Sequence, residues 1–330
     1  MLYLHGIGHF HPENVIDNAL LESLDIGTNE QWILERVGIH TRRTVLDLDY
    51  IRKTKNQDPR GVFEASVYNN AQTGAKAARL AIERAGITPE DIGLVISGTC
   101  IPDNAIPAEA AGVASELGIN ALCFDLNSAC TSFGMQIHFL DAMKPDALPP
   151  YVLVVNPENM TKSVNYNDRS VAVLFGDGSS AAVVSSTIVS PKVFSASFCQ
   201  SKPSAWDKVV IPRMGHFKQD GHAVQGFAIR KTTDSLRALK KLFPGKDDHF
   251  KFVGHQANLG MLQTVCERAD IPEANHWHNV ENYGNTGCAG PPTVLSQHWD
   301  ELAPGDYVAI ALVGSGLTWA HMMLEVKGEA

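Results

Sequence analysis

The chain has 330 residues, of which 44% are hydrophobic and 19% are charged, and its formal net charge is -9. This composition is typical of a folded α/β protein that buries a sizeable core. The negative charge, without any long basic run, argues against nucleic acid as a partner, and no apolar stretch reaches the length of a membrane span. The six cysteines lack paired or disulfide-like spacing and the chain start lacks a signal-like segment, which together predict a reduced, cytoplasmic protein.

The first half of the chain predicts alternating helices and strands. An N-cap at Thr28 predicts a short helix that ends near Gly38. Further helices are expected over residues 71–85 and 108–117. Apolar runs predict strands at residues 2–7, 92–97, 121–126, 151–155, 171–175 and 181–184, the last two joined by a tight glycine turn.

The second half repeats this order of elements without visible sequence identity to the first. Helices are expected over residues 232–242 and 258–269, and strands over 250–253 and 306–313. In both halves, polar or reactive residues stand where strands give way to helices, and α/β folds place their sites at such junctions.

Cys130 lies at one of these junctions, in Asp125-Leu-Asn-Ser-Ala-Cys130. The free N–H groups and the positive dipole of the helix start lower the pKa of a thiol there and favour a nucleophilic thiolate. The alternative is that Cys130 is simply a small buried apolar residue of the core, as most free cysteines are.

His255 and Asn285 could act together with Cys130. A histidine can hold the thiolate and manage protons during acyl transfer, and a neutral amide can polarise a carbonyl oxygen. Taken singly, His255 is better explained as a helix cap and Asn285 as a turn residue, but the combination favours chemistry. Trp32 and Arg36 share one face of a predicted helix, where they would contact an adenine and a phosphate or cover the edge of the core.

With these residues in place, the chain resembles the β-ketoacyl-[acyl-carrier-protein] synthase III family, condensing enzymes of the thiolase fold, over nearly its full length. Six motifs stand in the family's order: Gln31-Trp32-Ile33 with Arg36-Val-Gly-Ile39, Asn127-Ser-Ala-Cys130, Asp168-Arg169 with Phe175-Gly-Asp-Gly178, His255-Gln-Ala-Asn258, Gly284-Asn-Thr-Gly287, and Gly314-Ser-Gly-Leu-Thr-Trp319.

The resemblance implies an α/β fold of thiolase type, with five αβαβα layers made of two similar halves, and a homodimer. Residues 1–176 would carry the nucleophile, and residues 177–330 the histidine and the asparagine. It implies no metal and no redox cofactor, because the coenzyme A thioester is a substrate.

The resemblance also implies a reaction in two stages. An acyl group from acyl-CoA would load Cys130. His255 and Asn285 would then polarise a malonyl or β-ketoacyl thioester for a Claisen condensation, expected to be decarboxylative. The backbone N–H groups of Cys130 and Ser315 would form the oxyanion hole, because negative charge grows on that oxygen in the transition state.

The resemblance assigns further residues to substrate binding. Contacts to coenzyme A are expected from Thr28, Trp32, Arg36, Lys162, Gly215 and Asn258. Ile106, which would reach across the dimer, and Val313 are expected to shape the acyl pocket. An acyl carrier protein is a further expected partner.

Several positions depart from the family pattern. Lys162 stands where an arginine often stacks on the adenine, and Gly260 stands where an arginine often docks the carrier protein. The basic segment of residues 230–246 would be a substitute docking patch or a solvated helix face. These departures favour a condensation in a specialised pathway. The alternative is an acyltransferase that forms an ester or an amide without a carbon–carbon bond.

Overall fold

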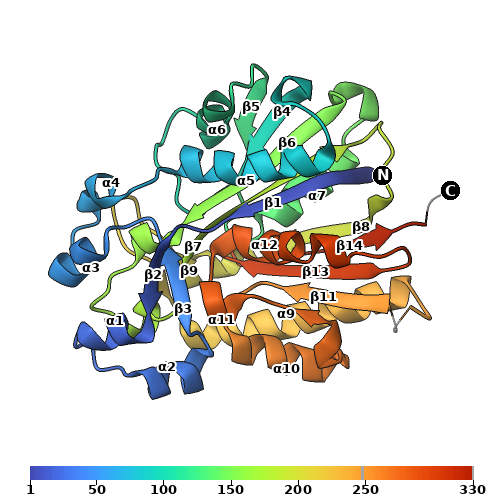
Figure 1. Ribbon diagram of the computed structural model, residues 1–330. Helices are drawn as coiled ribbons and strands as arrows, with labels where there is room; N and C mark the ends of the chain where they lie inside the picture. The colour runs from blue at the N-terminus through green and yellow to red at the C-terminus, as the bar shows by residue number, and fades with distance from the viewer. Residues whose placement is uncertain (247–248, 329–330) are drawn as a thin grey trace.

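The computed structural model describes residues 1–246 and 249–328. Ten strands form one hydrogen-bonded sheet that divides into two similar halves (Figure 1). The first half consists of β1 (Leu2–Phe10), β4 (Ile92–Ser97), β5 (Leu122–Asp125), β6 (Tyr151–Asn159) and β7 (Asp177–Ser185). The second consists of β8 (Lys192–Ser201), β11 (Phe250–Gly254), β12 (His276–Trp277), β13 (Tyr307–Gly314) and β14 (Thr318–Val326).

The two halves have the same topology. The strand order is β5-β4-β6-β7-β1 in the first half and β12-β11-β13-β14-β8 in the second. In each half the first three strands are parallel and the last two pair antiparallel. The halves meet where β1 pairs with β8, at Leu2 with Phe194 and Tyr3 with Val193.

Helices complete the five αβαβα layers. The outer helices α5 (Asn70–Ala85) and α6 (Glu109–Leu117) cover the first half-sheet, and α9 (Gly221–Leu242) packs on the second beside α10 (Leu259–Ala269). Between the half-sheets lie α7 (Ser132–Ala142), which contacts β6, β8 and β14, and α12 (Gly290–Gln297), which contacts β1, β7 and β11 (Figure 1). The five-layer arrangement predicted from the sequence is therefore confirmed.

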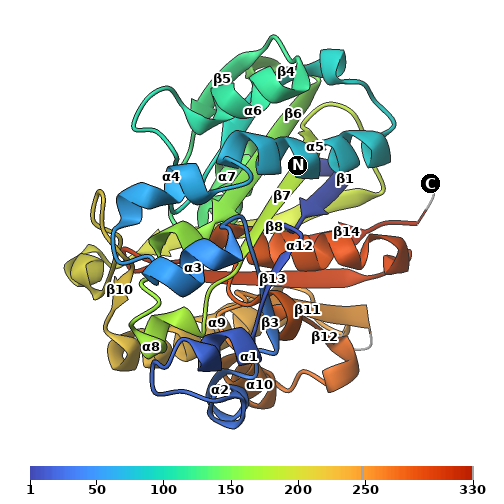
Figure 2. The same ribbon diagram turned by 60° about the vertical axis from the view of Figure 1, so that its left-hand side comes forward.

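Shorter elements are inserted between the main strands and helices of each half. Several of them gather on one side of the molecule (Figure 2). The shorter elements are α1 (Asn18–Ser23), α2 (Glu30–Val37), α3 (Leu48–Thr54), α4 (Val62–Ala65), α8 (Arg169–Ala172), α11 (Val280–Tyr283), β2 (Asn14–Asp17), β3 (Thr41–Thr44), β9 (Val209–Val210) and β10 (Lys218–Gln219).

The outer helix α5 packs unusually closely on β1, because β1 carries glycines on that face. A Cβ on Gly6 or Gly8 would collide with the carbonyl oxygens of Ala81 and Ala77, respectively. The alanine-rich face of α5 and these two glycines therefore belong to one packing arrangement. None of the helices in the described part of the chain has the length and apolarity needed to cross a lipid bilayer.

Four predictions about the elements need correction. Helix α2 is capped by Asn29, whose side chain accepts from the Trp32 N–H, and not by Thr28. Helix α9 begins at Gly221, well before residue 232. The apolar run 171–175 begins inside the short helix α8 and continues as a turn instead of forming a strand, and Asp177 and Gly178 are the first residues of β7. Since β7 pairs with β1 and β6, the structural halves divide between β7 and β8 and not at residue 176.

Candidate active site

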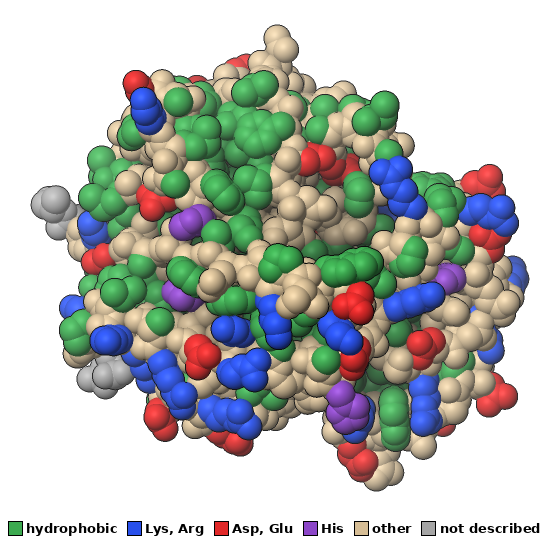
Figure 3. Space-filling model, turned by 180° about the vertical axis from the view of Figure 1, so that it is seen from behind, with side chains coloured by type: hydrophobic (Ala, Val, Ile, Leu, Met, Phe, Trp, Pro, Cys, Tyr) green, Lys and Arg blue, Asp and Glu red, His purple; other side chains and the backbone are tan. Residues whose placement is uncertain are grey.

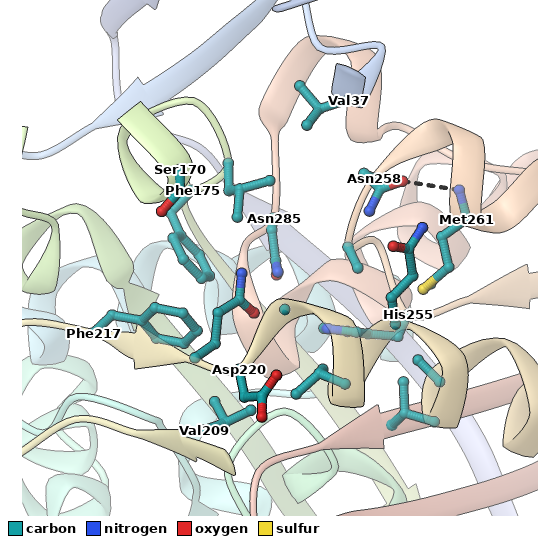
Figure 4. Close-up of a pocket in the computed structure, with 18 of the residues that line it drawn as sticks. Val37, Ser170, Phe175, Val209, Phe217, Asp220, His255, Asn258, Met261 and Asn285 are labelled. Carbon is teal, nitrogen blue, oxygen red and sulfur yellow. Dashed lines mark hydrogen bonds between the residues drawn. The ribbon is translucent and has the colours of Figure 1, made fainter. Parts of the chain in front are cut away.

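A cavity of about 770 Å³ lies where the two halves of the fold meet. Cys130, His255 and Asn285 all line it. They come from three different segments: the junction before α7, the junction after β11, and the loop between α11 and α12. The close-up in Figure 4 shows His255 and Asn285 pointing into this space. Tertiary folding therefore brings together the three residues expected to carry chemistry.

The backbone presents Cys130 at the start of α7. Ala129, the residue before it, has a left-handed φ of 48°, a conformation that non-glycine residues seldom adopt. Hydrogen bonds hold this turn: the Ser132 hydroxyl accepts from the Ser128 N–H at 2.9 Å and donates to the Ala129 carbonyl at 2.7 Å. The Thr131 hydroxyl lies 2.8 Å from that of Thr318, so the turn is also tied to the second half-sheet.

The surroundings of Cys130 favour its thiolate. A hydrogen bond from Cys100 is the main influence that lowers the Cys130 pKa well below its ordinary value, and His255 adds to it against the opposing effect of burial. The two sulfur atoms lie 3.8 Å apart. The same contact, together with burial, raises the pKa of Cys100 well above its ordinary value. Cys130 is therefore the more acidic partner and Cys100 remains a thiol.

His255 is held at the end of β11. It is buried, and its backbone N–H donates to the Ala311 carbonyl at 2.9 Å, which fixes it against β13. Three residues later, the Asn258 side chain accepts from the Met261 N–H at 2.8 Å and caps α10 (Figure 4). His255 thus precedes the helix and does not cap it.

Asn285 presents its amide nitrogen to the cavity. Its backbone is fixed by two hydrogen bonds, from its N–H to the Leu174 carbonyl at 2.8 Å and to its own carbonyl from the Gly176 N–H at 3.1 Å. Its side-chain oxygen accepts from the Gly287 N–H at 3.0 Å. Because the oxygen is occupied by the backbone, the NH₂ group is the part of the amide left to donate to a ligand.

The end of β13 lies directly against the nucleophile. A Cβ on Gly314 would stand 3.2 Å from the backbone nitrogens of both Cys130 and Thr131, so only glycine allows this approach without displacement. Ser315 follows in the cavity wall, where its hydroxyl donates to the Val209 carbonyl at 2.6 Å. Val313 lines the same wall.

Trp32, Arg36 and Arg169 line another part of the cavity wall. The Arg169 guanidinium lies 4.9 Å from the centre of the Trp32 ring and donates to the Gly27 carbonyl. An aromatic plate with two cations beside it suits a planar base that carries phosphates. Asn258 lines the cavity as well.

Lys162, which is expected to contact coenzyme A, is not among the residues that line this cavity. Lys162 is buried elsewhere, with its ammonium 2.6 Å from the Asp103 carboxylate. Arg169, which belongs to a motif recognised in the sequence but received no role, occupies the place beside Trp32. Its neighbour Asp168 caps α8, the helix that begins with Arg169.

Three other predicted residues are not part of the described cavity lining. Thr28 and Gly215 are absent from it, although Trp32 and Phe217 close to them are present. Ile106 lies on the surface with 85% of its area exposed. Its predicted role concerns a second subunit, so it stays a prediction.

Two residues close to Cys130 were not predicted from the sequence. Cys100 follows β4 and contacts Cys130. Glu158, in β6, is buried, accepts from the Cys100 N–H, and has a second oxygen without a hydrogen-bond partner among the described residues. Burial raises the pKa of Glu158 to about 7. An isolated glutamate or cysteine carries no sequence signal for such a position.

A cysteine, an imidazole and an amide that line one cavity between two equivalent half-sheets are the arrangement of an enzyme of the thiolase fold. The comparisons narrow this class. Residues 124–203 match the family model described as 3-oxoacyl-[acyl-carrier-protein (ACP)] synthase III, and residues 245–326 match its C-terminal model. The chain belongs to the β-ketoacyl-[acyl-carrier-protein] synthase III family, whose members are condensing enzymes, a kind of transferase.

Individual relatives resemble the whole chain. It is 31% identical to the β-ketoacyl-[acyl-carrier-protein] synthase III of Sulfurovum sp. (strain NBC37-1), covering 98% of this chain and 96% of the relative. The crystal structure of 3-oxoacyl-[acyl-carrier-protein] synthase III from Aquifex aeolicus VF5 superimposes with a TM-score of 0.87 at 26% identity, covering 98% of this chain and 100% of the other. The crystal structure of the 3-oxoacyl-(acyl carrier protein) synthase III from Pseudomonas aeruginosa PAO1 superimposes with a TM-score of 0.85 at 27% identity, covering 100% of this chain and 99% of the other.

Proposed function

We propose that this enzyme takes an acyl group from acyl-CoA onto Cys130 and condenses it with a malonyl thioester, releasing carbon dioxide. The observation that carries the proposal is the meeting of Cys130, His255 and Asn285 in one cavity whose wall also holds Trp32 and Arg169. Trp32 and Arg169 would bind the adenine and phosphates of coenzyme A, which directs the thioester toward the nucleophile.

In the first stage, the Cys130 thiolate attacks the acyl-CoA carbonyl. The S–C bond to Cys130 forms, negative charge develops on the carbonyl oxygen, and the coenzyme A thiolate leaves and takes up a proton. The backbone N–H groups of Cys130 and Ser315 stabilise that charge. The close approach of Gly314 to Cys130 supports this assignment, because it brings the start of the Ser315 segment beside the nucleophile.

In the second stage, His255 and the Asn285 NH₂ group donate to the thioester carbonyl of the malonyl group. They stabilise the enolate that remains when carbon dioxide departs, and the enolate carbon attacks the acyl group on Cys130. The Cys130 thiolate is the leaving group. The orientation of the Asn285 amide, with its oxygen occupied by the Gly287 N–H, supports this donor role.

An enzyme that only transferred an acyl group to oxygen or nitrogen would have no enolate to stabilise. The Asn285 amide would then contribute little to turnover. The Asn285→Ala variant separates the two functions, because condensation requires the amide after Cys130 has been loaded.

We also propose that the enzyme is a homodimer in which β5 pairs with its copy. β5 is an edge strand of the ten-stranded sheet, and Leu122 on it is 66% exposed. Phe139 on α7, the helix that follows, is 50% exposed. Figure 3 shows hydrophobic side chains gathered over the upper part of one face, over the N-terminal half of the fold. A second copy would cover such an edge and continue the sheet.

For the second substrate, we propose that an acyl carrier protein docks on α9. The exposed residues Arg230, Arg237 and Lys241 lie on this helix, and Val224, Phe227 and Ala228 of the same helix line the cavity. A basic helix at the cavity wall suits an acidic carrier. Arg237→Glu would raise KM for a carrier-bound extender and leave the loading of Cys130 from acyl-CoA unchanged.

The experiment that tests the main proposal is intact-protein mass spectrometry after incubation with a panel of acyl-CoA thioesters. We expect one acyl group to add to the wild type and none to Cys130→Ala. Asn285→Ala should load the acyl group and then fail to release a condensed product when malonyl thioester is added. Loading of Cys130→Ala, or product formation by Asn285→Ala at the wild-type rate, would contradict the proposal.

A further inference from the structure

Two thiols lie in contact beside the cavity, and the condensation uses only one of them. The Cys100 and Cys130 sulfur atoms are 3.8 Å apart. Both residues are of intermediate exposure, and Cys130 lines the cavity, so a small solute that enters the cavity reaches the Cys130 sulfur. Cys100 has no step in the acyl-transfer chemistry, which leaves its position against the nucleophile unexplained.

The two sulfur atoms must come closer before they can form a bond. Bond formation requires an approach of about 1.8 Å, from 3.8 Å to a disulfide length of about 2.0 Å. Cys100 leads out of β4 into residues 101–108, which form bends with no helix or strand. Its backbone is held by the hydrogen bond from its N–H to Glu158, so a rotation of the side chains has to supply the approach.

We propose that Cys130 and Cys100 form a modification site at which hydroperoxides reversibly oxidise the nucleophile to a disulfide. In the first step, the Cys130 sulfur attacks the peroxide: the S–O bond forms, the O–O bond breaks, and the alcohol or water leaves with a proton. Cys130 becomes a sulfenic acid and the peroxide is reduced. In the second step, the Cys100 sulfur attacks the Cys130 sulfur: the S–S bond forms, the S–O bond breaks, and water leaves with the thiol proton.

The two thiols are suited to these different roles. The thiolate is the form that reacts with peroxide, and the lowered pKa of Cys130 provides it. Cys100 is protonated while Cys130 is a thiolate, because its contact with Cys130 and burial raise its pKa, and the effect of the thiolate ends when the sulfenic acid forms. The disulfide would prevent further oxidation of Cys130 to the irreversible sulfinic acid, and a dithiol reductant would restore the nucleophile.

A third thiol nearby does not fit the resolving role. Cys288 is fully buried, and its sulfur donates to the Gly98 carbonyl at 3.3 Å. Cys199, on β8, is a free cysteine of intermediate exposure and provides a matched control.

The experiment treats the wild-type enzyme with a small excess of hydrogen peroxide and measures the intact mass. We expect the loss of two hydrogen atoms, a peptide that joins the Cys100 and Cys130 segments after digestion without reductant, and complete loss of acyl loading. Dithiothreitol should restore both the mass and the loading. Cys199→Ser should behave like the wild type.

The Cys100→Ser variant supplies the second measurement. We expect it to gain one oxygen and then a second on Cys130, trappable by dimedone at the first stage and no longer recovered by dithiothreitol at the second. Direct conversion of the wild type to the sulfinic acid, or a joined peptide that contains Cys288 in place of Cys100, would overturn the proposal. Peptide mapping of the wild type decides the matter even if Cys100→Ser fails to fold.

Discussion

The guanidinium of Arg169 lies 4.9 Å from the centre of the Trp32 ring, in the wall of the cavity that leads to Cys130. The two residues are far apart in the sequence and belong to α8 and α2. Their contact shows that Arg169 is the cation that lies over the Trp32 ring.

We expect Arg169→Ala to weaken binding of coenzyme A by about tenfold, or about 1.4 kcal/mol, since the variant removes the cation that we propose contacts the phosphates. Arg169→Lys should restore only part of the lost affinity for coenzyme A, because lysine lacks the planar stacking surface. Isothermal titration calorimetry measures the Kd of both variants for coenzyme A. Arg60→Ala, which removes an exposed arginine paired with Asp58, should leave the Kd unchanged. Equal weakening by the two alanine variants would show that the loss reflects net charge alone.

Lys162 is expected to stabilise the fold and to leave substrate binding unaffected. Lys162→Met would leave the Asp103 carboxylate, which is only 11% exposed, without its ion-pair partner, and we expect a loss of about 3–5 kcal/mol in the free energy of unfolding. Urea unfolding at neutral pH measures this change. Arg52→Met, which breaks an exposed pair with Asp49, should cost less than about 1 kcal/mol. A large rise in Kd for coenzyme A without loss of stability would return Lys162 to the binding site.

Gly314→Ala tests the approach of β13 to the nucleophile. The new Cβ would stand 3.2 Å from the backbone nitrogens of Cys130 and Thr131 and would push the segments apart. We expect kcat to fall by about 10- to 100-fold with little change in KM, because a displaced oxyanion hole affects the transition state most. Gly226→Ala on α9, where no atom lies within 4 Å of the added Cβ, is the control and should keep wild-type kcat. An unchanged kcat in Gly314→Ala would exclude this segment from catalysis.

Glu158 should make stability depend on pH. Its pKa is raised from 4.5 to about 7 in the fold, so the native state binds more protons than the unfolded chain between these values. The contribution of Glu158 to stability is therefore fully present below about pH 4.5 and is lost as the pH rises through about 7, by up to about 3 kcal/mol.

Glu158→Gln isolates this effect, because glutamine keeps an oxygen for the Cys100 N–H and does not titrate. We expect the difference in unfolding free energy between the variant and the wild type to move in favour of the variant as the pH rises from 4.5 to 7. Burial raises the pKa of Asp177 to about 6, so Asp177 also makes the unfolding free energy depend on pH. This contribution is the same in both proteins and cancels in their difference. Parallel stability curves for the two proteins would contradict the assignment.

Much of the architecture and the chemistry could be predicted from the sequence because their signals are local. The helix pattern that ends at Gly86, and the change from strand to helix at Cys130, each depend on a few consecutive residues. The six motifs in order led to the five-layer fold, which the structure confirms. The errors also came from local signals: residues 171–175 have the apolar composition of a strand, yet the first two of them belong to α8 and only Phe175 forms a β-bridge, with Asn285.

The sequence by itself determined the nucleophile candidate, the histidine and asparagine expected to act with it, and the family to which the chain belongs. Only the tertiary structure decided that Arg169 and not Lys162 lies beside Trp32, and that Cys100 contacts Cys130 with Glu158 buried behind it. The physical reason is that these contacts join segments separated by many residues. No periodicity or capping pattern encodes such pairings, and they form only when the half-sheets close around the central helices.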